Sequence, residues 1–117
     1  METIIAGGRD YRFTEKDIAF LDSIAPQITE VVSGGAHGAD SCGEAWAKSK
    51  GIPIKVFKAD WIRHGKAAGP RRNSEMAAYA DAAVLFSGGR GTADMATKAM
   101  NFSLTVYDMR IKRTPPR

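Results

Sequence analysis

Residues 84–92 read Val-Leu-Phe-Ser-Gly-Gly-Arg-Gly-Thr, an apolar run that ends in paired glycines and leads into a helical pattern. The same layout occurs twice earlier, where Ile4-Ile5-Ala6 precedes Gly7-Gly8 and Val31-Val32-Ser33 precedes Gly34-Gly35. Glycine reaches positive φ without steric cost and lets a ligand approach the main chain, while the following helix offers unpaired N–H groups and a positive dipole end. Because parallel strands bring such junctions to one sheet edge, the three together predict a phosphate-binding α/β domain.

Composition places the chain among single-domain globular proteins. The 117 residues are 44% hydrophobic and 26% charged, which excludes disordered and fibrous classes. The net charge of +4 suggests nucleic acid until the charges are located. The chain has 17 basic and 13 acidic residues, and four of the basic ones lie in residues 110–117, so residues 1–109 are neutral. We therefore expect a folded domain over 1–109 and a basic flexible tail over 110–117, which argues against a nucleic-acid partner.

The cysteine count and the termini bear on the compartment. Cys42 is the single cysteine, so the chain has no intramolecular disulfide and no all-cysteine metal site. No spacing of His, Cys, Asp and Glu indicates a metal site, and neither Cys42 nor any serine has a plausible activating partner. The first residues lack the basic and apolar regions of a signal peptide, and no apolar run is long enough to cross a bilayer. We expect a cytoplasmic protein with no membrane partner.

Strand-like runs alternate with helical patterns along the chain. Strands are expected over 2–6, 29–33, 53–57, 82–86 and 104–107. Helices are expected from the Thr14–Asp17 capping box to Pro26, over 39–49, over 71–80 after Pro70, and over 92–102, with a weakly periodic stretch at 59–69. The first helix is expected to bury Ile18, Leu21 and either Ile24 or Ala25, and the last to bury Met95, Ala96, Ala99 and Met100.

This alternation implies βαβ units and a parallel sheet. We expect an α/β fold, a single-domain Rossmann-like three-layer sandwich whose five-stranded parallel sheet has the order 3-2-1-4-5. The order reverses between the first and fourth strands. The first and third glycine turns then lie on either side of the switch-point crevice, where open α/β sheets bind ligands.

Four motifs carry a family resemblance: residues 7–11, 33–40, 59–73 and 88–95. In this order they resemble the YspA-like branch of the SLOG superfamily. The resemblance spans residues 4 to about 107 and implies a Rossmann-like nucleotide-binding domain and a homo-oligomer. More distant relatives are the lonely-guy phosphoribohydrolases, the molybdenum-cofactor carrier proteins and the DNA-processing protein A family.

The third turn is the most specific of these motifs. The backbone of Gly88, Gly89, Arg90 and Gly91 can form an anion nest, and the Thr92 hydroxyl can bond a phosphate or cap its own helix. The lonely-guy pattern is Pro-Gly-Gly-x-Gly-Thr-x-x-Glu. Here Ser87 replaces the proline, and the glutamate position falls on Met95 with Asp94 one residue earlier. Asp94 is either a carboxylate favoured by the helix dipole or a group that contacts ribose or stabilises an oxocarbenium-like centre.

A second basic motif follows Pro70. Arg71 and Arg72 stand at the expected start of a helix, where the dipole disfavours cations and an anionic ligand would reverse that effect. An arginine of a comparable helix contacts substrate in the lonely-guy enzymes, which implies a ligand-binding and possible catalytic role for Arg72. Arg72 and Asn73 are therefore candidate ligand contacts. The alternative is a surface salt bridge and an amide that satisfies the preceding loop.

The first two turns supply further candidates. Beside Gly7 and Gly8, Arg9 can clamp a phosphate and Asp10 can accept from ribose hydroxyls, or the two can pair locally. After the second strand, Ser33, Gly34 and Gly35 offer a hydroxyl and N–H donors.

Several polar and aromatic residues near these turns have two interpretations. His37 contacts the ligand or is a structural hydrogen-bonding residue, and Asp40 is most simply a helix cap. Tyr11 and Trp61 stack on a base or pack against the protein, and His64 is structural.

The sequence thus predicts a protein that binds a nucleotide or nucleotide-derived ligand as a sensor, carrier or sequestering protein, and it requires no cofactor. One alternative is a nucleoside 5′-monophosphate phosphoribohydrolase or N-glycosidase, which would use Asp94 and Arg72. A second alternative is a nucleic-acid-binding protein like DNA-processing protein A. The neutral folded domain argues against the second, and the missing glutamate argues against the first.

Overall fold

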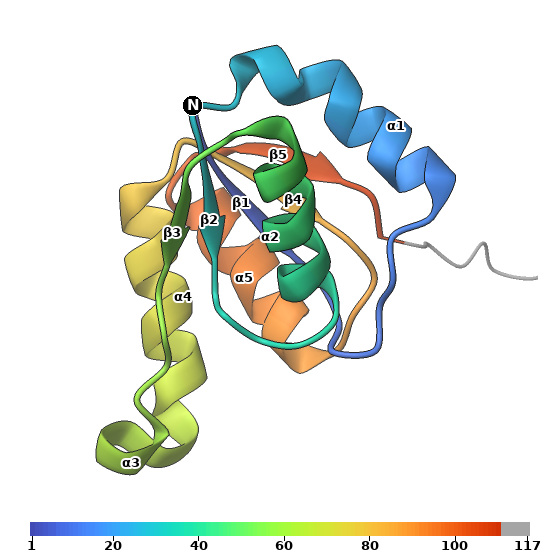
Figure 1. Ribbon diagram of the computed structural model, residues 1–117. Helices are drawn as coiled ribbons and strands as arrows, with labels where there is room; N and C mark the ends of the chain where they lie inside the picture. The colour runs from blue at the N-terminus through green and yellow to red at the C-terminus, as the bar shows by residue number, and fades with distance from the viewer. Residues whose placement is uncertain (111–117) are drawn as a thin grey trace, which may run out of the picture.

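The computed structural model describes residues 1–110, which form one five-stranded parallel sheet with helices on both faces (Figure 1). The strands are β1 (Glu2–Ala6), β2 (Glu30–Ser33), β3 (Ile54–Val56), β4 (Ala82–Leu85) and β5 (Thr105–Asp108). The helices are α1 (Glu15–Ile24), α2 (Ala39–Lys50), α3 (Trp61–His64), α4 (Ala68–Tyr79) and α5 (Arg90–Asn101), with short 3-10 helices η1 (Ala25–Gln27) and η2 (Gly65–Ala67). No helix within the described range is long and apolar enough to cross a membrane.

The strand order is β3-β2-β1-β4-β5, so the expected 3-2-1-4-5 order and the α/β sandwich are confirmed. The order reverses at β1, which pairs with β2 on one side and with β4 on the other; Ile4 lies opposite Val32 and Ala83. The predicted tail over 110–117 lies outside the described residues except for Arg110, whose guanidinium forms an ion pair with Asp108 at 2.8 Å.

The two faces of the sheet carry separate cores because successive strand residues point to opposite sides. Ile4 and Val32 belong to the core under α4 and α5, whereas their neighbours Ile5 and Val31 belong to the core under α1 and α2. The central strands therefore carry consecutive apolar residues rather than an alternating pattern, as buried parallel strands do, and β4 is apolar at all of its positions.

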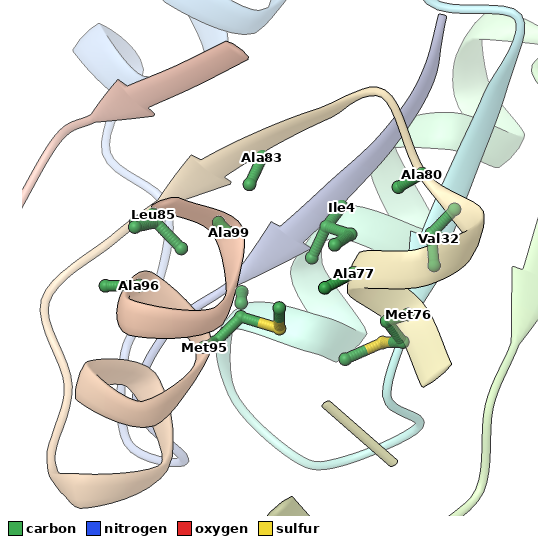
Figure 2. Close-up of a cluster of buried hydrophobic side chains, with 11 residues drawn as sticks. Ile4, Val32, Met76, Ala77, Ala80, Ala83, Leu85, Met95, Ala96 and Ala99 are labelled. Carbon is green, nitrogen blue, oxygen red and sulfur yellow. The ribbon is translucent and has the colours of Figure 1, made fainter. Parts of the chain in front are cut away.

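The core under α4 and α5 is rich in alanines and contains two methionines beside Ile4, Val32 and Leu85 (Figure 2). Small side chains such as Ala77 and Ala99 let the helices lie close to the sheet, and Met76 and Met95 extend toward each other from α4 and α5. Both methionines are at most 3% exposed, and full burial of such a side chain stabilises the fold by about 1.5–3 kcal/mol. Both methionines pack between the sheet and the helices α4 and α5.

Helix α1 begins as expected at a capping box, in which Thr14 and Asp17 bond each other's backbone. Leu21 and Ile24 are buried, but the expectation for Ile18 is wrong, since its side chain is 42% exposed and Asp17 is buried instead. Met100 of α5 is likewise 71% exposed and is not a core residue. Both misassigned residues stand at the edge of their helix's apolar stripe.

Helices α4 and α5 begin earlier than expected. The stretch 59–69, expected to be weakly periodic, contains α3, η2 and the first residues of α4. Helix α3 lies at the N-terminal end of α4 and projects beyond the sheet (Figure 1). Pro70 is therefore the third residue of α4, where its missing N–H would have had no acceptor within the helix. Helix α5 begins at Arg90 rather than Thr92, so Gly91 lies in its first turn.

Candidate functional site

A cleft of about 560 Å³ lies where the strand order reverses, between the turn after β1, the first turn of α5 and the arm formed by α3, η2 and the start of α4. Its position is the one at which open α/β sheets bind ligands, and its volume suits a small molecule. It is lined by Ala6, Gly7, Gly8, Arg9, Ala36, Asp40, Trp61, Lys66, Gly69, Pro70, Arg72, Asn73, Met76, Gly89, Arg90, Gly91, Thr92, Asp94 and Met95.

The turns after β1 and β4 touch each other at the edge of this cleft. The Gly8 N–H donates to the Ser87 carbonyl at 2.9 Å. A Cβ on Gly88 would collide with Thr92 Oγ1 and would lie 2.7 Å from the Gly8 nitrogen. These glycines are needed for close backbone approach. The expectation of positive φ is wrong for these two turns, because Gly35 and Gly38 after β2 are the turn glycines that adopt it.

Gly89 and Gly91 are different because they leave space open. A Cβ on either residue would meet nothing within 4 Å, and both line the cleft. Gly89 is the N-cap of α5 and has no side chain with which to cap the helix. The first intrahelical bond is from the Ala93 N–H to the Gly89 carbonyl at 3.0 Å, so the preceding N–H groups of α5 have no acceptor within the helix. An anion at this position would receive both these N–H groups and the positive end of the helix dipole.

Thr92 is not the cap of α5. It is the third helical residue, 6% exposed, and its hydroxyl oxygen lies against Gly88. The Thr92 hydroxyl therefore fixes the turn after β4 from inside, while its residue still borders the cleft.

The start of α2 is capped by main chain rather than by a side chain. Gly38 is the N-cap with φ of 75°, and a Cβ there would collide with the carbonyl oxygens of Gly8 and Arg9. The Gly8 carbonyl accepts the N–H groups of Tyr11 and Ala39, each at 3.1 Å. Glycine is thus required at position 38 for both its conformation and the lack of space.

Asp40 is consequently not the N-cap, as the sequence suggested, but the second residue of α2 and a lining residue of the cleft. Its side chain is buried, and its Oδ2 accepts the Ala36 N–H at 3.1 Å. Burial raises the pKa of this carboxyl to about 6; the Ala36 bond and the Arg72 charge oppose the rise, and Glu44 adds to it. The carboxyl group is therefore largely ionised at neutral pH despite its burial.

Arg72 is held beside Asp40 by two bonds of its guanidinium. Its Nη1 donates to the Gly34 carbonyl at 2.6 Å, and its Nε donates to Asn73 Oδ1 at 3.0 Å. A Cβ on Gly34 would lie 2.6 Å from Arg72 Nη1 and 3.0 Å from Asp40 Oδ2, so glycine there makes room for both charged groups. Since α4 begins at Ala68, Arg72 lies in its second turn, and the predicted repulsion by the helix dipole does not apply.

Asp94 is fixed by a second set of bonds on the opposite wall. Asn73 Nδ2 donates to Asp94 Oδ2 at 2.9 Å and to the Gly91 carbonyl at 3.2 Å. Lys98 Nζ, four residues further along α5, bonds both oxygens of Asp94 at 2.6 and 2.7 Å. The carboxylate is thus neutralised within its own helix.

The cleft brings together most of the predicted ligand-binding residues, and their contact with a ligand stays a prediction. Those that line it are Gly7, Gly8, Arg9, Arg72, Asn73, Gly89, Arg90, Gly91, Thr92 and Asp94. The predicted residues outside its lining are Asp10, Ser33, Gly34, Gly35, His37 and Gly88. Ser33 turns away, since its hydroxyl donates to Glu44 at 2.6 Å, while Asp10 and His37 are exposed.

The two aromatic candidates for base stacking, Tyr11 and Trp61, have different surroundings. Tyr11 stacks on Phe86 with ring centroids 5.4 Å apart and donates to Asp17 at 2.6 Å, so it packs against the core. Burial and the Asp17 bond raise the pKa of Tyr11 to about 12. Trp61 lies on the cleft and is 52% exposed.

Sequence reasoning missed four lining residues that bear on function. Asp40 was interpreted as a cap, and Met76 and Met95 are buried in the core under α4 and α5 as well as bordering the cleft. A signal existed for Met95, which stands at the glutamate position of the lonely-guy pattern. Lys66 lies in the weakly periodic stretch, where no sequence pattern distinguished it.

Comparison with known proteins supports the motif-based resemblance. A family model matches residues 1–64, which include the turns after β1 and β2 and end before Arg72 and the turn after β4. The Gene 61 protein of Mycobacterium phage D29 is 42% identical over 72 residues, which cover 56% of this chain and 58% of that protein. No solved structure matches. Because the family match covers more than half of the chain, the chain belongs to the YspA, cpYpsA-related SLOG family.

Proposed function

We propose that the chain binds a nucleotide or nucleotide-derived ligand in the cleft, as a sensor, carrier or sequestering protein. The observation that carries this proposal is the open first turn of α5, where Gly89 and Gly91 leave the backbone uncovered. The cations Arg9, Lys66 and Arg90 line the same cleft and are exposed. N–H groups that have no acceptor within their own helix, beside exposed cations, favour a phosphate.

The cleft also has an apolar lining that suits a planar ring. Trp61 and Pro70 border it from the α3–α4 arm, and Met76 and Met95 border it from the core. Flat aromatic and polarisable sulfur-containing side chains pack well against a planar base. A ligand with a phosphate at one end and a base at the other therefore matches the distribution of polar and apolar groups.

Binding is favoured over hydrolysis by the state of Asp94. Cleavage of an N-glycosidic bond requires a carboxylate placed against an oxocarbenium-like centre and a proton for the leaving base. Both oxygens of Asp94 are bonded to Lys98, and Met95, at the glutamate position of the lonely-guy pattern, is 1% exposed. The carboxylate thus lacks the free charge that the phosphoribohydrolase reaction needs.

Native mass spectrometry of freshly purified protein, followed by calorimetric titration with nucleoside 5′-monophosphates and diphosphates, tests the proposal. We expect a retained small molecule or saturable binding with one site per chain. Absence of both, in protein whose circular dichroism shows the α/β fold, would contradict it. Single-stranded and duplex DNA added to the same titration test the nucleic-acid alternative.

We also propose that the chain forms a homo-oligomer, as its family resemblance implies. Size-exclusion chromatography with light scattering measures the mass directly, and a monomer at micromolar concentration would contradict this proposal.

A further inference from the structure

Two carboxylates, those of Asp40 and Asp94, line a cleft whose other charged side chains are cations. A carboxylate repels a phosphate, so neither group serves phosphate binding directly. An ionised carboxylate is an acceptor only, and its natural partners in a ligand are hydroxyl or amino groups. The question is which of the two carboxylates has bonding capacity left.

Asp94 has little. Lys98 Nζ bonds both of its oxygens, at 2.6 and 2.7 Å, and Asn73 Nδ2 donates to Oδ2 at 2.9 Å. These three bonds come from two neighbouring side chains, and the lysine also neutralises the charge. A ligand hydroxyl at Asp94 would compete with an ion pair that is already formed.

Asp40 is less saturated. The Ala36 N–H donates to Oδ2 at 3.1 Å, and the backbone of Gly34 also bonds the carboxylate, so two main-chain groups occupy part of its capacity. The charged groups that face it are Arg72 from α4 and Glu44 from its own helix. A carboxylate has about four acceptor positions, so Asp40 has capacity for a ligand. At 8% exposure, it lines the cleft beside Arg72 and is largely shielded from water.

We propose that Asp40 accepts hydrogen bonds from the sugar hydroxyls of the ligand and thereby selects ribose over deoxyribose, an inference that rests on the proposed function. The open N–H groups of α5 take the phosphate and the half-exposed Trp61 borders the outer wall. The sugar of a nucleotide joins its phosphate to its base, so it lies between these two parts of the cleft, and the proposal places it against Asp40. Burial strengthens a bond from a hydroxyl to this carboxylate, because water competes for it less.

The site also explains why the carboxylate is kept despite its cost. A buried carboxyl whose pKa is raised to about 6 is less stable when ionised than an amide or apolar side chain would be. Its bond to Ala36 would be served equally by an asparagine oxygen. A ligand that donates hydroxyl groups gives the negative charge a role that the loop alone does not.

Calorimetric titration at pH 7.5 of the full chain with the four ribonucleoside 5′-monophosphates and their 2′-deoxy counterparts tests this inference. A hydrogen bond to a charged group contributes about 1.5–3 kcal/mol, so we expect the ribo form to bind roughly 10- to 100-fold more tightly. Asp40→Asn should bring the ratio close to one, and Asp22→Asn, the same change on the exposed side of α1, should leave it unchanged.

Each outcome separates this inference from the proposed function. Equal affinity of ribo and deoxy forms for the wild-type chain, or a ratio unchanged in Asp40→Asn, overturns the role of Asp40 while nucleotide binding stands. If the affinity differences follow the identity of the base rather than the 2′-hydroxyl group, and are lost in Asp40→Asn, the assignment of Asp40 to the sugar is wrong. Binding of none of the eight nucleotides overturns both. If Asp40→Asn fails to fold, the ratio of ribo to deoxy affinity of the wild type is compared at pH 7.5 and pH 5. The titration of the phosphate affects both nucleotides equally and cancels in this ratio. Protonation of Asp40 at pH 5 should lower the ratio, and an unchanged ratio overturns the role of Asp40.

Discussion

The side-chain amide of Asn73 donates to the carboxylate of Asp94 at 2.9 Å and so ties α4 to α5 across the cleft. The same amide donates to the Gly91 carbonyl at 3.2 Å and accepts from Arg72 Nε at 3.0 Å. Asn73 is 5% exposed, so these bonds are shielded from water. One buried residue thus positions an arginine, a carboxylate and the first turn of α5.

Asn73→Ala should lower the free energy of unfolding by about 1–3 kcal/mol, because it leaves buried groups without their partners. It should also weaken nucleotide binding, since the first turn of α5 loses its tie to α4. Urea denaturation and calorimetry measure the two effects. Ser74→Ala is the matched control: its exposed hydroxyl bonds the Pro70 carbonyl at 3.2 Å, and its removal should change stability by less than about 0.5 kcal/mol.

The two neighbouring glycines of the third turn should respond in opposite ways. Gly88→Ala should destabilise the fold, because the new Cβ would collide with Thr92 and crowd the Gly8 backbone. Gly89→Val should fold with a loss of about 1 kcal/mol at the helix cap, since open space surrounds its Cβ, and should abolish nucleotide binding by filling the cleft. Thermal melts and calorimetry compare them. Unchanged affinity in folded Gly89→Val would disprove the phosphate site.

Arg72→Ala should weaken binding of nucleoside monophosphates by about 1.5–3 kcal/mol, if its guanidinium contacts the phosphate. If Arg72 stood in the first turn of the helix, as expected from the sequence, removal of the cation would leave the free protein unaffected or more stable. Because Arg72 bonds the Gly34 carbonyl and lies beside Asp40, we now expect the free protein to lose about 1–3 kcal/mol. Denaturation without ligand measures this loss, and a more stable free variant would show that the guanidinium is dispensable to the fold.

Asp40 should make stability depend on pH. Burial raises its pKa from 3.8 to about 6, so between these values the folded protein binds the proton more tightly than the unfolded chain. Stability from this group therefore falls as pH rises from about 4 to about 6 and stays low above that. Asp40→Asn should be more stable than wild type by up to about 3 kcal/mol at pH 7.5, with the gain shrinking toward zero at pH 4. A constant difference across this range would show that Asp40 keeps an ordinary pKa.

Incubation with nucleoside 5′-monophosphates should give binding without release of free base. The reason is the Lys98 ion pair, which neutralises Asp94, the carboxylate nearest the lonely-guy glutamate position. Chromatography of the reaction measures the base. Efficient release that disappears in Asp94→Asn would instead make the chain a phosphoribohydrolase whose carboxylate is shifted by one residue.

The fold followed from local patterns because each pattern had one physical reading. The apolar runs around Ile4, Val31 and Val84 are too short for helices, and the first two contain paired β-branched residues. The intervening helices require parallel crossovers. The helix expected over 39–49 is observed as α2, and Gly51, with its φ of 69°, terminates it after Lys50. These features depend on neighbours in sequence, which is why they were predictable.

The errors arose where distant segments decide. Asp40 resembles a cap until the Gly8 carbonyl, from another loop, takes the Ala39 N–H. The start of α4 depends on how η2 joins it, and one partner of Arg72, the Gly34 carbonyl, lies 38 residues away in the sequence. Sequence patterns located the cleft and many of its residues, but not the bonds among their side chains.

The two peptide groups that flank Gly8 order the loops around the cleft before a ligand binds. The Gly8 N–H donates to the Ser87 carbonyl, and the Gly8 carbonyl accepts the N–H groups of Tyr11 and Ala39. These hydrogen bonds join the loops after β1 and β4 to the start of α2. A ligand arriving at α5 meets loops that are already ordered, and little conformational entropy is lost on binding. Amide hydrogen exchange should then slow at Tyr11 and Ala39 when the cleft is filled, although neither residue lines it.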